Sequence, residues 1–296
     1  MKVPDVSVVV AVYNEEQFIE AALASILSQE GVDVEVVVVD DQSTDGTAKL
    51  IERLQRQWGN LQFIRNEKKG KVSAFNLGVA RAGGRLVALF AGDDIMPAGS
   101  LRARVASVNA VKGDGPVVGL CRLRIMSENP KIDGQEIPKR ADRGCFSGVS
   151  YLWNRAALEK FWPIPETLPN EDTWLEVVAQ HADIDIIHSG VIGCSWRMYE
   201  GNSINVLLPW QEFNKRYTPR MAAAWHFLNA RGDTLTEEAR RRLRARVECE
   251  DARIRGDLAG ILLTNADWVT KLRAAAFSGR RMYALRQLGL KLLSGF

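Results

Sequence analysis

Two uninterrupted apolar runs constrain the fold of this chain more than any other feature: residues 7–13, SVVVAVY, and residues 34–40, VEVVVVD. A strand with one face in solvent alternates apolar and polar residues, whereas a strand covered on both faces is apolar along its whole length. β-Branched residues dominate both runs, and such residues favour strands. The two runs therefore predict buried strands in a sheet that has helices on both faces.

Helical patterns alternate with these strands and with two further ones. The order βαβαβαβ predicts a doubly wound α/β domain with a mostly parallel sheet. Asn14, followed by Gln17 three residues later, predicts the start of the first helix, and Gly31 predicts its end. The later helices are predicted near residues 51–58, 72–82 and from 97, and the later strands near residues 61–66 and 85–94.

The pattern weakens in the second half of the chain. Residues 127–144 are polar and contain Pro and Gly, which predicts a surface loop, and residues 148–161 predict a turn and a helix. From Leu208 onward the sequence reads as helical. We therefore divide the chain into an α/β domain, residues 1–206, and a C-terminal helical extension, residues 207–296.

Composition excludes several classes of protein. The formal net charge of +3 over 296 residues is too small to indicate a nucleic-acid partner. The four cysteines have no paired spacing, which predicts reduced thiols in a cytoplasmic protein. The N-terminal apolar run is too short for a signal peptide, and no segment approaches the roughly 20 apolar residues that span a bilayer.

Acidic residues follow the predicted ends of three separate strands, as Glu15, the pair Asp40-Asp41 and the pair Asp93-Asp94. Parallel strands deliver the residues after their carboxyl ends to one edge of the sheet, where α/β proteins bind ligands. Asp is also common in turns, which explains any one of these groups. Three groups together predict a site, because a bound cation or a ligand with donor groups would relieve their repulsion.

Five ordered motifs resemble the family 2 glycosyltransferases, which have the GT-A fold. The motifs are VSVVVAVYNEE, VVVVDDQSTDGT, KGKVSAFNLGVARAGG, LVALFAGDD and NEDTWL, and they span roughly the first two-thirds of the chain. The resemblance implies transfer of a sugar from a nucleotide diphosphate donor to an acceptor hydroxyl, with inversion and with Mg²⁺ or Mn²⁺. It favours a UDP-sugar as donor, a glycan or lipid-linked glycan as acceptor, and a role in polysaccharide or glycolipid assembly.

The resemblance also assigns residues to the donor side of the site. Asp94, with Asp93, would hold the metal, because hard divalent cations take oxygen ligands and bridge substrate phosphates. The family motif is often Asp-x-Asp, and its first acid is here Gly92 or Ala91, depending on the register. The further donor-binding residues that the resemblance implies are Ala11, Tyr13 and Glu15 around the nucleoside, Asp40 at the base, and Lys71, Asp93 and Arg197 near the diphosphate.

Glu171-Asp172 is the second acidic pair that the resemblance singles out. Attack by a sugar hydroxyl needs a general base, and Asp172 matches the family acid at that position, with Glu171 orienting the site. The plain alternative is that both acids complement the dipole of a helix N-terminus. The family often has a histidine shortly after the arginine that Arg197 matches, but Met198, Tyr199 and Glu200 follow here, so no role is transferred to them.

The end of the chain is basic. Residues 268–296 carry six Lys and Arg residues and no acid, and Met282, Leu285, Leu288 and Leu292 recur at helical spacing. Such a helix fits an anionic membrane surface, which would place the protein at the inner face of the membrane. The open alternatives are packing on the catalytic domain and packing on a second subunit.

Two other functions stay open beside glycosyl transfer. A non-catalytic nucleotide-sugar-binding protein would explain the missing first acid of the metal motif, although such a protein has no need of Asp172. A nucleotidyltransferase would also use metal on an α/β fold, but it would carry a Gly-rich phosphate loop where this chain has YNEEQF.

Overall fold

The computed structural model describes residues 2–199 and 208–293, which form two compact units. The first unit comprises residues 1–179 and 184–198, and the second comprises residues 180–183 and 199–296. The boundary predicted between residues 206 and 207 lies outside the described residues.

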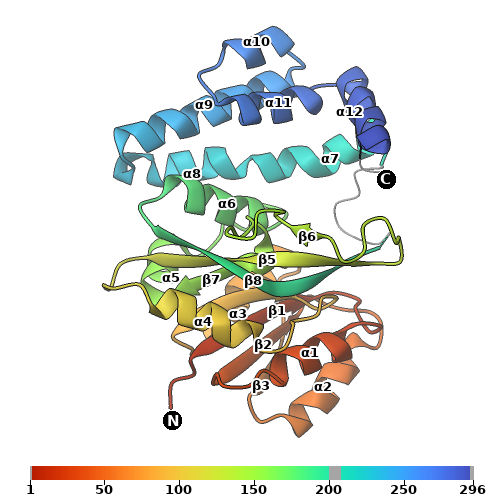
Figure 1. Ribbon diagram of the computed structural model, residues 1–296, viewed down its shortest axis with the longest axis vertical. Helices are drawn as coiled ribbons and strands as arrows, with labels where there is room; N and C mark the ends of the chain where they lie inside the picture. Colours follow the sequence, from red (N-terminus) through yellow and green to blue (C-terminus); the bar gives the residue numbers. More distant parts are fainter. Residues whose placement is uncertain (1, 200–207, 294–296) are drawn as a thin grey trace. The chain divides into compact units, whose positions relative to one another are not determined.

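The first unit begins with the predicted alternation of strands and helices (Figure 1). Its first half consists of β1 (Val6–Val12), α1 (Ile19–Leu27), β2 (Val34–Asp40), α2 (Thr47–Gln57), β3 (Leu61–Arg65), α3 (Lys71–Arg81), β4 (Leu86–Ala91) and α4 (Ser100–Asn109). The second half consists of β5 (Val117–Ser127), β6 (Glu136–Ile137), β7 (Tyr151–Asn154), α5 (Arg155–Phe161), α6 (Asp172–His181) and β8 (Asp185–Met198).

These strands form one mixed sheet, in the order β3-β2-β1-β4-β7-β5-β6, with β8 paired to β5. β1, β2, β3 and β4 are parallel to one another, as predicted, and β8 is parallel to β5. The antiparallel pairs all involve β7 or β6. The mostly parallel α/β sheet is therefore confirmed.

Both faces of β1 are covered, which is why its sequence is apolar throughout. Val8 and Val10 belong to a core that includes residues of α1, α2 and α4. Val9 faces the opposite side, where it packs against α3 so closely that a Cβ on Gly78 would lie 2.3 Å from Val9 Cγ1.

Several local predictions were wrong. Asn14 does not cap α1, because its backbone is left-handed (φ 55°) and its Oδ1 accepts a hydrogen bond from Thr44 N at 2.8 Å, so α1 begins only at Ile19. The same helix ends at Leu27, before Gly31. β6 interrupts the predicted surface loop, and β7 precedes the helix that was predicted over residues 148–161.

The second unit is helical in its described part, as predicted from Leu208 onward. Its helices are α7 (Trp210–Met221), α8 (Ala223–Arg231), α9 (Glu237–Ile254), α10 (Leu258–Leu263), α11 (Trp268–Ala276) and α12 (Arg280–Leu293). Phe213, Phe277 and Tyr283 form its aromatic core, with Tyr283 on α12. None of the helices within the described residues is both long and apolar enough to cross a membrane.

Arg253 of α9 lies at the centre of the second unit with its side chain 1% exposed. Its guanidinium donates to Glu250 Oε1 (2.7 Å), Asn214 Oδ1 (3.0 Å), Thr218 Oγ1 (2.9 Å) and the carbonyl of Phe277 (3.1 Å). These contacts join α9 to α7 and to the end of α11. A buried guanidinium is tolerated here because several acceptors and one carboxylate surround it.

Candidate functional site

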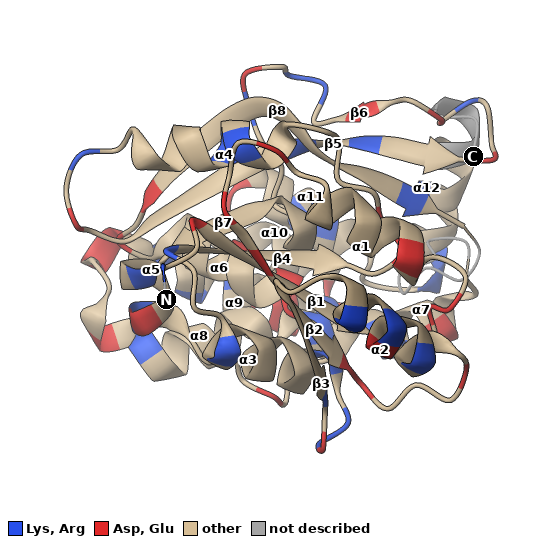
Figure 2. Cartoon of the chain, turned by 90° about the horizontal axis from the view of Figure 1, so that it is seen from below, with Lys and Arg blue, Asp and Glu red and all other residues tan. Residues whose placement is uncertain are grey.

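The carboxyl ends of β1, β2 and β4 meet at one edge of the sheet. Val12 is in register with Asp40, and Ala11 is in register with both Val39 and Ala91. The turns that follow these strands therefore start side by side. Charged residues of both signs are spread over the helices and loops around the sheet (Figure 2).

The residues predicted around the nucleoside occupy different environments at this edge. Ala11 is buried within β1, whereas Tyr13 is exposed and lies under Lys69, whose Nζ is 4.2 Å from the ring centroid. Asp40 is 2% exposed, and its Oδ1 accepts a hydrogen bond from Ser43 N at 3.2 Å. Asp40 thus shapes the turn after β2 in addition to any contact with a base.

Asp93 and Asp94, after β4, have unequal surroundings. Asp94 is 1% exposed; its Oδ1 accepts from Arg197 N at 2.8 Å and its Oδ2 accepts from the Cys194 thiol at 3.4 Å. Burial, and next the neighbouring Asp93 charge, raise the pKa of Asp94 to about 7. These contacts tie Asp94 to β8 and leave Asp93 the more accessible of the two.

Arg197 lies beside the same pair. Its Nε donates to the carbonyl of Asp93 at 2.8 Å, and its guanidinium carbon lies 4.6 Å from the centroid of the Phe18 ring. An antiparallel bridge between Ile95 and Ser195 holds β8 against the segment after β4. The structure thus brings Arg197 to the acidic edge, where positive charge would meet a diphosphate.

Glu15 points its side chain toward the segment after β4. A Cβ built on Gly92 would lie 1.9 Å from Glu15 Oε2, so this carboxylate occupies space that any other residue at position 92 would fill. Glu15 Oε2 is buried and has no hydrogen-bond partner among the described residues. Burial, and after it the charge of Asp93, raise the pKa of Glu15 well above its usual range.

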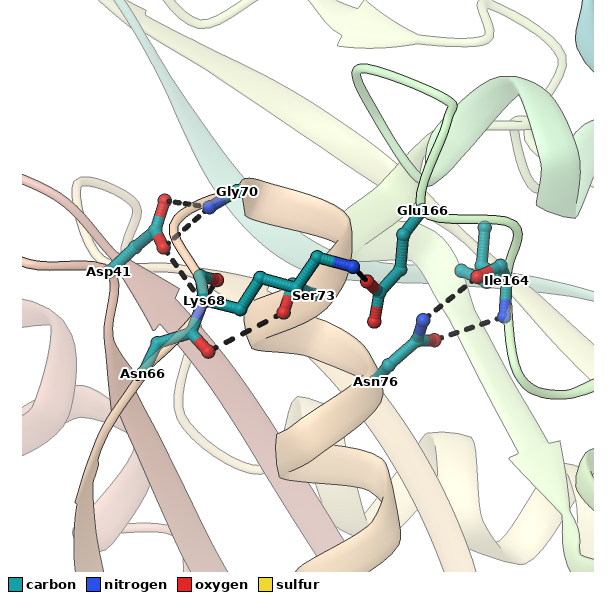
Figure 3. A network of polar contacts seen from close by, with 8 residues as sticks. All are labelled: Asp41, Asn66, Lys68, Gly70, Ser73, Asn76, Ile164 and Glu166. Carbon is teal, nitrogen blue, oxygen red and sulfur yellow. Dashed lines mark hydrogen bonds and ion pairs between the residues drawn. The ribbon is translucent and has the colours of Figure 1, made fainter.

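Asp41 anchors the loop between β3 and α3 (Figure 3). Its carboxylate accepts hydrogen bonds from Gly70 N at 2.8 and 3.0 Å and from Asn66 Nδ2 at 2.8 Å. Asp41 thus holds the residue that precedes α3. The left-handed backbone at Gly70 (φ 146°) turns that N–H toward the carboxylate.

Two lysines of this loop and the first residue of α3, also a lysine, reach three different segments. Lys68 pairs with Glu166, Lys69 covers Tyr13, and Lys71 Nζ lies 3.0 Å from Glu171 Oε1. Lys71 also lowers the pKa of Glu15 electrostatically, although burial outweighs it. Lys71 thus acts both on Glu15, after β1, and on Glu171, which precedes α6.

Glu171 and Asp172 lie at the start of α6, as predicted. Glu171 is 4% exposed, and Gly148 packs against it so closely that a Cβ there would lie 2.7 Å from Glu171 Oε1. Asp172 is partly buried in the first turn of α6. Lys71 supplies the positive charge that the buried Glu171 carboxylate needs. Asp172 is the next residue in the chain.

Asn76 positions the loop that precedes this acid pair. Its Nδ2 donates to the carbonyl of Ile164 at 2.8 Å, and its Oδ1 accepts from Ile164 N at 3.0 Å (Figure 3). Local patterns carry no sign of such contacts, because the two partners are 88 positions apart.

The donor groups at this edge fit a hard divalent cation, which prefers carboxylate oxygens. Glu15 Oε2 is a buried oxygen without a described partner, and Asp93 and Asp94 act on its pKa. The described residues nevertheless include no group of three or more His, Cys, Asp or Glu side chains that could hold a metal by themselves. Substrate oxygens and water would have to supply the remaining ligands.

This arrangement of sheet and helices is that of the GT-A fold. Two solved structures share the fold: S. aureus TarS in complex with UDP-GlcNAc (TM-score 0.62, 22% identity, covering 95% of this chain and 83% of that one), and the mannosyltransferase PcManGT from Pyrobaculum calidifontis with GDP-Man and Mn²⁺ (TM-score 0.61, 22% identity, covering 98% and 80%).

Residues 7–147 match the sequence model of glycosyl transferase family 2. The succinoglycan biosynthesis protein ExoO of Rhizobium meliloti is 36% identical over 136 residues, 46% of this chain and 37% of the relative. A GalNAc(5)-diNAcBac-PP-undecaprenol beta-1,3-glucosyltransferase of Campylobacter jejuni is 31% identical over 122 residues, 40% of this chain and 39% of the relative. The matches thus span well under two-thirds of these relatives.

Proposed function

We propose that this chain is an inverting glycosyltransferase that moves a sugar from a nucleotide diphosphate donor, a UDP-sugar by preference, to an acceptor hydroxyl in polysaccharide or glycolipid assembly. The observation that carries this proposal is the place of Lys71. It pairs with Glu171 at 3.0 Å and acts electrostatically on Glu15, whose pKa is in turn raised by the charge of Asp93. Lys71 therefore interacts with a residue proposed for the donor, Glu15, and with a residue proposed for the acceptor, Glu171.

The chemistry assigns a task to each side. Departure of the nucleotide diphosphate requires positive charge where negative charge develops, which Arg197 and a divalent cation near Asp93 would supply. Asp94 stays a predicted metal ligand. Both of its carboxylate oxygens already accept hydrogen bonds, however, so Asp93 is the more available ligand. Mg²⁺ or Mn²⁺ would be held by carboxylate oxygens here, and the Mn²⁺ in PcManGT supports that choice.

The remaining residues bind or position substrate. Ala11, Tyr13 and Asp40 would surround the nucleoside, and Glu15 belongs to the nucleotide-sugar side. Asp172 would accept the proton of the attacking hydroxyl, with Glu171 held by Lys71 beside it. UDP and UDP-GlcNAc in TarS favour a uridine nucleotide as the donor, whereas GDP-Man in PcManGT leaves a guanosine nucleotide as the alternative.

A thermal-shift screen of UDP-, GDP- and TDP-sugars, each with Mn²⁺ and with EDTA, tests the donor and the cation together. We expect a UDP-sugar with Mn²⁺ to raise the melting temperature most, since a ligand at 100 times its Kd stabilises the folded state by about 2.7 kcal/mol. Stabilisation by no nucleotide sugar under either condition would contradict the proposal. Stabilisation without turnover on any glycan or lipid-linked acceptor would favour the non-catalytic binding protein.

We further propose that the second unit contacts an anionic membrane surface, which would bring the enzyme to a lipid-linked acceptor at the inner face of the membrane. Large apolar side chains of α11 and α12 are mostly exposed: Trp268, Val269, Leu272, Leu285 and Leu288. Basic residues accompany them without any acid in residues 268–296. A surface with both features matches an interfacial, anionic partner better than bulk water.

Flotation with vesicles that contain anionic lipid tests this contact. Removal of α11 and α12 would also remove Phe277 and Tyr283 from the core, so point variants are the sharper probe. We expect Trp268→Ser with Val269→Ser to reduce binding to anionic vesicles, and Trp225→Ser, at another exposed tryptophan of this unit, to leave it unchanged. Equal binding by all proteins would reject the contact, and a concentration-dependent dimer lost in the double variant would indicate a second subunit instead.

A further inference from the structure

We propose that Glu15 supplies the acidic ligand that the segment after β4 lacks, so that a cation bound with the nucleotide diphosphate is held by a carboxylate from the β1–α1 loop together with Asp93. This inference rests on the proposed function and adds to it a cation ligand of this chain's own. The strand end reads Ala91-Gly92-Asp93-Asp94, with no acid at its first two positions.

The first observation is steric. Glu15 Oε2 lies where the side chain of residue 92 would begin, 1.9 Å from the Cβ position, and Val12 Cγ1 lies 2.8 Å from the same point. Only glycine at position 92 leaves this space to a carboxylate that comes from another loop. The charge missing from the strand end is thus replaced from outside it.

The second observation is that the main chain of Glu15 is fixed while one of its carboxylate oxygens is not satisfied. Glu15 N donates to Thr47 Oγ1 at 2.8 Å, and the Glu15 carbonyl accepts from Phe18 N and Ile19 N, both at 3.0 Å. Glu15 Oε2 is buried without a hydrogen-bond partner among the described residues. An unsatisfied buried carboxylate oxygen costs stability, which is expected where a site awaits a cation.

The third observation concerns the charged residues that act on Glu15. Asp93, Asp94 and Asp45 act on it as like charges, and Lys71 is the basic residue that acts on it. Lys71 is already engaged by Glu171. A purely structural carboxylate would pair with its nearest cation or face water, whereas this one is subject to the charges of three other acids.

The experiment measures Mn²⁺ binding to the full chain in the presence of UDP, by electron paramagnetic resonance. The proteins are wild type, Glu15→Gln, Glu15→Ala, Gly92→Ala, and Glu15→Ala with Gly92→Ala. We expect Glu15→Gln to weaken Mn²⁺ binding by about tenfold or more. Gly92→Ala should do the same without removing any charge, because the added methyl displaces the carboxylate. The double variant should be no weaker than Glu15→Ala alone, since both changes remove one interaction.

Two further readouts separate this role from others. Without ligand, Glu15→Gln should melt at the same temperature as wild type or higher, because a buried repulsion is removed, whereas a structural role predicts a lower melting temperature. In EDTA, UDP affinity should be unchanged or higher in Glu15→Gln, whereas a hydrogen bond to the ribose predicts a loss. Glu16→Gln, at the adjacent acid that binds Gly46 N instead, is the matched control and should keep wild-type Mn²⁺ binding.

The outcomes are distinct. Mn²⁺ binding by Glu15→Gln within twofold of wild type, while wild type takes up Mn²⁺ with UDP, overturns the role of Glu15 and leaves the proposed function standing. Absence of UDP-dependent Mn²⁺ uptake in the wild type overturns both. If Glu15→Gln does not fold, Mn²⁺ binding by Gly92→Ala, which keeps the Glu15 carboxylate and its charge, decides the role of Glu15 in the same way.

Discussion

Substitution of Asp172 by Asn is expected to lower turnover by a factor of about 10²–10⁴, the usual contribution of a positioned general base. The change keeps the size of the side chain and removes its ability to take a proton from the acceptor hydroxyl. Asp172 stands in the first turn of α6, next to the Glu171 that Lys71 holds. The measurement is product formation with the donor that the thermal-shift screen identifies, at saturating acceptor.

Nucleotide binding should be retained in Asp172→Asn, because none of the residues proposed for the donor lies on α6. The dissociation constant for UDP with Mn²⁺, measured by calorimetry, is therefore the internal control. Glu159→Gln, at an exposed acid of α5, is the matched control variant and should keep wild-type turnover. Turnover of Asp172→Asn within a few-fold of wild type would leave only the helix-dipole role for this acid.

Substitution of Arg253 by Met is expected to destabilise the second unit by about 3–5 kcal/mol, the usual cost of breaking a buried ion pair. Met keeps an unbranched apolar side chain but cannot donate to Asn214, Thr218 or the Phe277 carbonyl. Glu250 would keep a largely buried carboxylate without its partner. Burial, the largest influence on Glu250, already raises its pKa, so loss of the guanidinium should favour its protonation further.

Hydrogen exchange followed by mass spectrometry measures this effect for each unit separately. Amides of α7, α9 and α11 should lose protection in Arg253→Met, while β1 and β2, which contain none of the partners of Arg253, serve as the reference within the same molecule. Arg244→Met, at an exposed arginine of α9, should leave protection unchanged. Equal protection in Arg253→Met and wild type would mean that the network contributes no net stability.

The sequence was informative about the fold where one residue pattern extended over a whole element. β1 and β2 are apolar on both faces because helices cover both, and that pattern is visible in the sequence. β7 has only four residues, too few for a period, and it was missed. Asn14 looked like a helix cap because Asn commonly caps helices, but its side chain is engaged by Thr44, 30 positions further along.

The same contrast holds for the site. The acids at strand ends could be found because parallel strands place them at one edge, and Glu171-Asp172 because of a family resemblance. The tasks of Asp41 and Asn76 could not be found, since both depend on partners at least 25 positions away. The position of Glu15 against Gly92 was also hidden, because a missing side chain in one loop makes room for a side chain from another.

The two adjacent aspartates after β4 have different contacts, and this difference affects how variants at this edge are interpreted. Asp94 fastens β8 through the main chain of Arg197 and the thiol of Cys194. An inactive Asp94 variant would therefore report a displaced strand, and with it a displaced Arg197, before it reported a lost cation ligand. Scanning mutagenesis that scores acids only by activity would not separate these two effects.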